Sequence, residues 1–210
     1  DVDLTTYCAN IKEVLDAIDN DVKALMIPNL IGNKPNWKAL KEGLANIGRE
    51  DIVLIEDSAD TVTHTFETDI ATTSFYASHV ITAGGAGGMV MFKFLYGVLG
   101  YNMKSTEMQA AFGLVQLERF QKFFKLRRNN IERYIKNLQG VGDLILPDDS
   151  IKPNWLAIPL QSEKRFELLH FLEENNIQTR VTFAGNVTRH PIYREYLQEF
   201  TNSDLIMKNG

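Results

Sequence analysis

Cysteine is the scarcest chemistry-bearing residue of this chain, because Cys8 is the only one among 210 residues. A single thiol cannot close a disulfide within the chain. It also cannot supply the four ligands of a thiolate metal site or of an iron–sulfur cluster. Histidine is almost as rare, with four residues in the sequence. A histidine that stands in a turn directly after a strand is therefore a position to examine for chemistry.

Long apolar runs are missing too, since none approaches the roughly 18 residues that a membrane span needs. The charged opening DVDL predicts no signal peptide. Positive charge is in deficit, with 22 Lys and Arg against 27 Asp and Glu, and a net charge of -5 argues against nucleic acid as the main partner. We expect a cytoplasmic protein that acts neither on a membrane nor on nucleic acid. Its length is enough for one sizeable core, or for one domain and part of a second.

Helices and apolar strands alternate along the first half of the chain. Apolar residues recur at helical spacing in 11–18 and 37–47. Short apolar runs predict strands at 22–28, 51–57, 70–75 and 87–92. This order predicts an α/β fold whose central, mostly parallel sheet has helices on both faces. Ligands of such sheets bind beyond the carboxyl ends of the strands, where Asp57 and Ser74 stand.

The second half begins with a long helix, predicted from Ser105 to Leu138 and ended by Gly140. We interpret its Arg and Lys cluster as a solvated face. A strand at 155–160, a helix at 163–176 and a strand at 177–183 then predict a small α/β unit. We therefore divide the chain into a large cofactor-binding domain (1–115), a connecting helix (116–140) and a small C-terminal domain (141–210).

Single residues around the predicted strand ends give weak signals. Asp57 suits a helix cap as well as a carboxylate beneath a cationic ring nitrogen. Ser74 is either a turn hydroxyl or a donor to a phosphate. The glycines of GGAGG do not form a dinucleotide motif and are typical of a tight turn before a strand. His79, taken alone, is more often a satisfied polar residue than a catalytic one.

The order of the motifs carries more information than each motif does. IEDSAD, SFYASH, GGAGGMV and GYNMKSTEMQAAFGLVQLERF follow one another along the chain. This series resembles E-D-A-A, S-F-x-x-x-K, G-x-G-G-M, G-Y-N and Q-A-A-x-G-x-x-Q-L of the DegT/DnrJ/EryC1/StrS family. The family consists of pyridoxal-phosphate-dependent sugar aminotransferases with the type I aminotransferase fold, and the resemblance covers most of the chain.

The resemblance implies a role for each matching position. Asp57 would pair with the pyridine nitrogen of the cofactor, and Ser74 would hold its phosphate. Asn102 would reach the phosphate in the neighbouring subunit, since these enzymes are homodimers with shared active sites. Asp60 stands where the family has Gln or His near the ring oxygen, so we count it among the cofactor-binding residues with an open role.

His79 departs from the family, because it stands where the aminotransferases carry the lysine that binds the cofactor covalently. An imidazole cannot form that bond. This exchange is typical of the family's 3-dehydratases, which act on nucleotide-linked 4-keto-6-deoxyhexoses. TRVTFAGN is similar to their T-R-x-x-x-x-G-N stretch and makes Arg180 and Asn186 candidate substrate contacts. For Arg180 a surface salt bridge is an equally good interpretation.

The resemblance thus implies C3 dehydration of such a sugar in dideoxysugar or O-antigen lipopolysaccharide biosynthesis, with pyridoxamine or pyridoxal phosphate and with His79 as the base. One version of this chemistry regenerates the cofactor with glutamate, without a metal. The other uses a [2Fe–2S] cluster, whose cysteines lie between the G-G-M strand and G-Y-N, and a partner reductase. In that interval, between Phe92 and Lys93, the resemblance predicts tens of further residues.

Three alternatives remain open at this point. A scaffold of the same fold without activity would explain the loss of the lysine. A family aminotransferase could use another lysine. A nucleic-acid role for the basic helix predicts salt-dependent binding.

Overall fold

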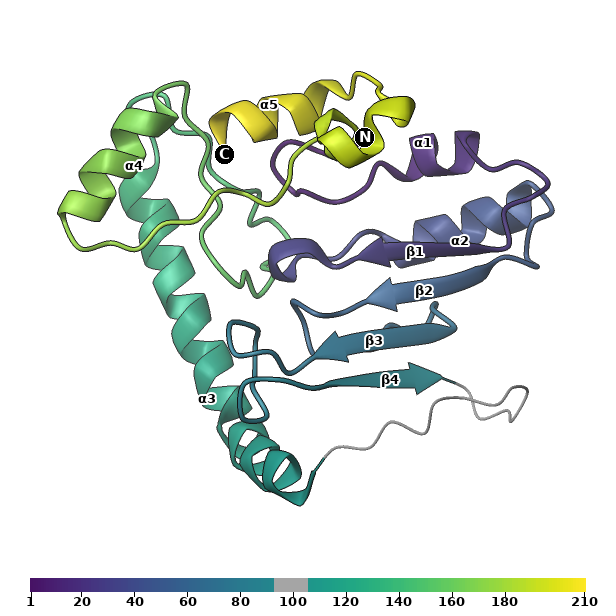
Figure 1. The fold of residues 1–210 in the computed structure, drawn as a ribbon, viewed down its shortest axis with the longest axis horizontal. Coiled ribbons are helices and arrows are strands. Elements are labelled where there is room, and N and C mark those ends of the chain that lie inside the picture. Colours follow the sequence, from purple (N-terminus) through teal and green to yellow (C-terminus); the bar gives the residue numbers. More distant parts are fainter. Residues whose placement is uncertain (93–105) are drawn as a thin grey trace.

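The computed structural model describes residues 1–92 and 106–210, and a four-stranded sheet with the order β1-β2-β3-β4 forms its centre (Figure 1). The strands are β1 (Ala24–Pro28), β2 (Val53–Asp57), β3 (Ile70–Ser74) and β4 (Gly88–Phe92). β1, β2 and β3 run parallel, whereas β4 pairs antiparallel with β3. The prediction of an α/β fold with a mostly parallel sheet is confirmed.

The two predicted helices of the first half form and cover one face of the sheet. Helix α1 (Ile11–Asp16) is capped by Asn10 and helix α2 (Trp37–Asn46) by Asn36, whose side chains accept a backbone N–H of the first turn. In Figure 1 α2 lies behind the sheet. The buried core between helices and sheet consists of Ile27, Trp37, Leu40, Leu44, Ile52 and Leu54. Burying these apolar side chains is what joins helices and sheet.

Coverage of both sheet faces by helices was predicted, and in the described residues this is wrong. Leu54 and Ala71 are 2% and 0% exposed, whereas Met26 and Val90 on the opposite side of the pleat are 60% and 56% exposed. Side chains alternate between the faces of a strand, so one half of each apolar run packs inward and the other half faces outward. A continuous apolar run does not reveal whether its outer half has a partner within the same chain.

The long helix is confirmed as α3 (Glu107–Leu138). The side chain of Thr106 accepts from the backbone of Gln109, and the Gln109 side chain accepts from the Thr106 backbone, which is a reciprocal capping box. Gly140, at φ 77, follows the helix end. Most of the basic cluster is exposed as predicted, but Arg128 is only 8% exposed.

The C-terminal part contains α4 (Arg165–Glu174), the short 3-10 helices η2 (Val187–Arg189) and η3 (Pro191–Tyr196), and α5 (Thr201–Asn209). The predicted helix is α4, but the strands predicted at 155–160 and 177–183 are wrong. Pro159 cannot donate to a ladder, and Phe183 has φ 53, which interrupts an extended chain. Only an isolated bridge between Ile145 and Gln161 forms there among the described residues.

A second buried cluster joins segments that are far apart in the sequence. It contains Tyr7, Ile31, Ile131, Trp155 and Ile206. Tyr7 and Trp155 meet edge to face with ring centroids 6.2 Å apart. Figure 1 shows the N-terminus beside α5, where the Asp1 carboxylate accepts from the backbone of Asn202 and Ser203. This cluster contains residues from all three predicted parts of the chain, 1–115, 116–140 and 141–210. The boundaries between these parts stay a prediction.

Candidate active site

The candidate site lies at the carboxyl edge of the parallel strands. β2 ends at Asp57 and β3 at Ser74, and Asp57 is paired in register with Thr72. Asp57 Oδ1 accepts from the backbone N–H of Ala59 at 3.1 Å and from Thr72 Oγ1 at 3.4 Å. These two donors fix a half-buried carboxylate at the edge where ligands of such sheets bind.

Ser74 begins the turn that leads to β4. Its Oγ accepts from the backbone N–H of Tyr76 at 3.1 Å, and Phe75 N–H donates to Gly87 O at 2.8 Å. Gly84, Gly85 and Gly87 adopt φ values of 74°, 100° and 124°, which glycine adopts without strain. The interpretation of the glycine cluster as a tight turn before a strand is confirmed.

His79 lies in this turn and faces Asp60. Its Nε2 is 4.0 Å from Asp60 Oδ1, and its ring meets that of Tyr76 edge to face with centroids 5.9 Å apart. His79 Nδ1 is buried and has no hydrogen-bond partner among residues 1–92 and 106–210. Such a buried, unpaired nitrogen costs free energy, and this is a feature of sites prepared for a ligand or for proton transfer.

Asp60 is a buried carboxylate, 9% exposed, that reaches from the loop after β2. Its Oδ2 accepts from the backbone N–H of Ile31 at 2.9 Å. Burial raises the pKa of Asp60, and the charge of Asp57 acts in the same direction, while the Ile31 hydrogen bond and His79 oppose them. The structure therefore brings Asp57, Asp60 and His79 into one electrostatic group.

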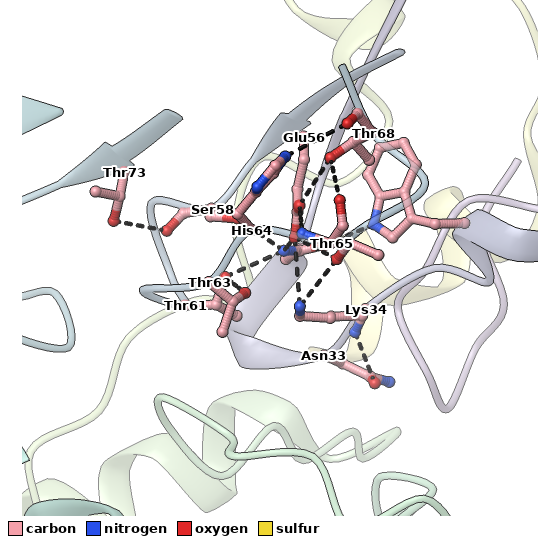
Figure 2. A network of polar contacts seen from close by, with 12 residues as sticks. Asn33, Lys34, Glu56, Ser58, Thr61, Thr63, His64, Thr65, Thr68 and Thr73 are labelled. Atoms are coloured by element: carbon pink, nitrogen blue, oxygen red, sulfur yellow. Dashed lines mark hydrogen bonds and ion pairs between the residues drawn. The ribbon is translucent and has the colours of Figure 1, made fainter. Parts of the chain in front are cut away.

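Glu56, the neighbour of Asp57 in β2, lies in a network of polar contacts and was missed by the sequence analysis (Figure 2). It is 0% exposed and accepts from Asn29 Nδ2 at 2.6 Å and from Thr65 N at 2.6 Å. Lys34 Nζ stands 3.4 Å from its Oε1. Burial acts to raise the pKa of Glu56, but the hydrogen bonds from Asn29 and Thr65 and the charge of Lys34 outweigh it and lower the pKa. The only sequence signal was a polar residue inside the apolar run DIVLIED.

The other candidate residues lie apart from this group. Arg180 is exposed, and its charge lowers the pKa of Glu173 after the stronger effect of hydrogen bonds from Thr179. Asn186 is 2% exposed and donates to Gln198 O and Asp204 Oδ1. Within the described residues neither side chain has a hydrogen bond or ion pair to Asp57, Ser74 or His79. Asn102 lies outside the described residues.

A cleft of about 240 Å³ opens beside Asp60. Asp60 and Val80 line one side, and Phe120 and Phe124 of α3 and Asn154 line the other. Asn154 Oδ1 is buried without a hydrogen-bond partner in the described part of the chain. The cleft therefore offers apolar surface next to the group formed by Asp57, Asp60 and His79.

The residues present fit a pyridoxal-type cofactor by the chemistry of their side chains. A fixed carboxylate at the end of β2 suits a protonated ring nitrogen. A hydroxyl and the backbone of a glycine-rich turn at the end of β3 suit a phosphate. Groups of three or more His, Cys, Asp or Glu that could hold a metal ion are absent from the described residues. Cys8, the single cysteine of the sequence, is buried elsewhere, and nothing supports the [2Fe–2S] alternative.

The fold is that of an α/β protein of the aminotransferase-like class, with polar side chains at the carboxyl edge of its parallel strands, where ligands of such sheets bind. The chain belongs to the DegT/DnrJ/EryC1/StrS aminotransferase family, whose sequence model matches residues 1–93 and 92–210. The two matched pieces meet at the interval where additional residues were predicted. The resemblance inferred from the four motifs is confirmed.

Among curated relatives, the lipopolysaccharide biosynthesis protein RfbH of Salmonella typhimurium is 31% identical, over 99% of this chain and 61% of its own length. A dTDP-4-dehydro-2,6-dideoxy-D-glucose 3-dehydratase of Saccharopolyspora spinosa is 29% identical, over 98% and 58%. The chain thus spans about three fifths of the length of these relatives.

The structure of E. coli GDP-4-keto-6-deoxy-D-mannose-3-dehydratase with bound hydrated PLP matches with a TM-score of 0.85 and 21% identity, over 100% of this chain and 67% of that chain. This likeness confirms the aminotransferase-like fold. Proteins named as sugar aminotransferases match with comparable TM-scores. In the described residues no helix combines the length and the apolarity that crossing a bilayer requires.

Proposed function

We propose that this protein dehydrates a nucleotide-linked 4-keto-6-deoxyhexose at C3, with pyridoxamine or pyridoxal phosphate as cofactor. One observation carries the proposal: His79 occupies the lysine position of the S-F-x-x-x-K motif and faces Asp60 at 4.0 Å, at the sheet edge that carries Asp57. The 3-dehydratase name of the Saccharopolyspora relative supports it. The name of RfbH supports a place in lipopolysaccharide biosynthesis.

Each residue has a distinct task in this proposal. When bound, the cofactor supplies a ring that accepts electrons. Asp57 keeps the ring nitrogen protonated, Ser74 and the turn after it hold the phosphate, and Asp60 belongs to the same group. Asn102 reaches the phosphate of the neighbouring subunit in a homodimer. Arg180 and Asn186 remain our candidates for substrate contacts.

His79 moves the proton. Its imidazole takes a proton from the carbon next to the ring and returns one to the departing C3 hydroxyl, which leaves as water. An imidazole suits both transfers because it exchanges protons near neutral pH. A lysine would instead deliver its proton to the sugar C4 and complete an amine transfer.

Substitution of His79 tests the function directly. His79→Lys is expected to suppress dehydration, and His79→Asn is expected to lower turnover by at least about a hundredfold. His170→Asn is the matched control, because the His170 side chain is 77% exposed and, in the described part of the chain, forms an ion pair only with the exposed Glu174. Full dehydratase turnover by His79→Asn would show that His79 is not the base.

A family aminotransferase is the second candidate, because the structure of a protein named as a sugar aminotransferase, CalS13 of Micromonospora echinospora, matches this chain with a TM-score of 0.86 and 18% identity. Such an enzyme would need another lysine, and borohydride reduction of the holoenzyme followed by peptide mass spectrometry would reveal the modified residue. An inactive scaffold need not retain a cofactor, and an absorbance scan shows whether one is bound.

A further inference from the structure

Among residues 1–92 and 106–210, Asp60 is the one side chain that connects His79 to the rest of the fold through a charge. The two residues come from different loops, one after β2 and one after β3. Asp60 Oδ1 faces His79 Nε2 at 4.0 Å, about 1 Å longer than a hydrogen bond. Separations of this kind in ligand-free sites shorten when the reacting molecules bind.

The other oxygen of Asp60 is fixed, which determines how the carboxylate is turned. Oδ2 accepts from the backbone N–H of Ile31 at 2.9 Å, and Ile31 O in turn accepts from Leu156 N–H at 2.7 Å. Ile31 adopts φ 54, a left-handed conformation that is costly for a β-branched residue. A residue keeps such a conformation only where the surrounding structure enforces it. Here the conformation directs the backbone N–H of Ile31 toward Asp60.

The backbone beside Ile31 cannot move away. Gly32 has φ 89, and a Cβ built on it would lie 2.4 Å from Asn154 O, so the loop is pressed against the segment before Leu156. The orientation of Asp60 is therefore set by packing between the sheet and the C-terminal part of the chain. With Oδ2 used by Ile31, only Oδ1 is left for His79.

We propose that Asp60 is the positioning residue of His79: it holds the ring with Nε2–H toward the carboxylate and leaves the Nδ1 lone pair free to take the proton. The buried Nδ1 without a partner among the described residues fits this assignment, because a neutral imidazole has one donor and one acceptor nitrogen. The inference rests on the proposed function, since it assigns the tautomer of the base named there.

Asp60→Asn gives a sharp test. The amide that replaces the carboxylate keeps its carbonyl oxygen on the Ile31 N–H, so its NH₂ group faces His79 Nε2 and can only donate. The ring must then carry its proton on Nδ1, and the lone pair is lost at that nitrogen. Wrong-tautomer variants of this kind keep their geometry and lose turnover.

The tautomer is measured by ¹⁵N NMR of the imidazoles in the cofactor-free protein at about pH 8, above the ordinary pKa of a model imidazole. His79→Gln assigns the signal. We expect Nε2–H in the unsubstituted protein and Nδ1–H in Asp60→Asn. Asp69→Asn is the matched control, because the Asp69 carboxylate also accepts one backbone N–H, that of Leu54 at 2.9 Å, without facing His79.

Turnover of the holoenzyme is measured on the same variants. Asp60→Asn should lower kcat about a hundredfold while KM stays within about twofold, since the substrate contacts are unchanged. Asp60→Glu keeps a carboxylate and should retain the Nε2–H tautomer and part of kcat. An Asp60→Asn protein with the original tautomer, or with unchanged kcat, overturns the assignment.

The two proposals fail separately. An unsubstituted enzyme that transfers an amine instead of expelling hydroxide refutes the proposed function, whereas the NMR experiment still decides the role of Asp60. Conversely, if the enzyme dehydrates its substrate and the His79 tautomer is unaltered in Asp60→Asn, the proposed function is retained. The role of Asp60 as positioning residue is then refuted.

Discussion

Arg128 of α3 and Asp149, 21 residues further along the chain, form a bidentate ion pair with two N–O distances of 2.7 Å. Arg128 also donates to Pro153 O at 2.7 Å, and Trp155 Nε1 donates to Asp149 at 3.2 Å. The pair thus fixes the segment that carries Trp155 of the second core onto α3. The direct ion pair from Asp149 is the largest effect that raises the pKa of Arg128.

Removing one partner of this pair should destabilise the fold strongly. Arg128→Ala leaves a largely buried carboxylate without its cation, and we expect a loss of about 3–5 kcal/mol in the free energy of unfolding. Arg128→Lys should lose less, but it cannot restore the bidentate geometry. Urea denaturation measures both. Arg133→Ala, at an exposed position of the same helix, should stay within about 0.5 kcal/mol of the unsubstituted protein; an equal loss there would contradict the special role of Arg128.

The buried carboxylate of Glu56 gives a second prediction. Glu56→Gln removes a charge that accepts several hydrogen bonds, and we expect about 2–3 kcal/mol of destabilisation at pH 7. The folded-state pKa of Glu56 is lowered, so its contribution is present above the unfolded pKa and is lost as pH falls through the folded one. The difference between the two proteins should therefore shrink on acidification. Glu42→Gln, whose side chain is 66% exposed, serves as control.

The single thiol should be unreactive in the folded protein. Burial raises the pKa of Cys8 to about 12, which keeps the group as a neutral thiol at physiological pH. Labelling by a disulfide reagent at about pH 8 should be at least about a hundredfold slower than in denaturant, where the thiol is an ordinary one. Rapid labelling of the native protein would mean that the segment around Cys8 opens easily.

An exposed ion pair in the C-terminal part predicts a dependence on pH. The hydrogen bond from Arg189 is the largest effect that lowers the pKa of Asp204 to about 2, and Asn186 adds to it. Because the folded-state pKa is lowered, the stabilisation is present above the unfolded pKa and disappears as pH falls toward 2. Asp204→Asn should therefore lower Tm at pH 7 and leave it unchanged near about pH 2. Glu195→Gln, on an exposed residue of the neighbouring η3, should shift Tm at neither pH.

Local patterns determined much of what the structure contains. The four strands, the two capped helices of the first half, α3 and α4 are all foreseen by spacing and capping residues, because these features depend on neighbours a few positions away. The place of Asp57 and Ser74 at strand ends, and of His79 in the turn after β3, follows for the same reason. Even the family could be recognised from the order of short motifs, which requires no contact to be known.

Tertiary structure alone decided how these pieces meet. The sequence does not show that Asp60 turns one oxygen to Ile31 and the other to His79, or that Glu56 is buried among threonines. The strands predicted at 155–160 and 177–183 had apolar residues, but Pro159 cannot donate to a ladder and Phe183 has φ 53, and neither segment joins the sheet in the described residues. The type and the spacing of side chains are encoded locally. Their partners are determined only when the folding chain closes long loops and buries the two partners together. The pairing of Asp60 with His79 is the main example.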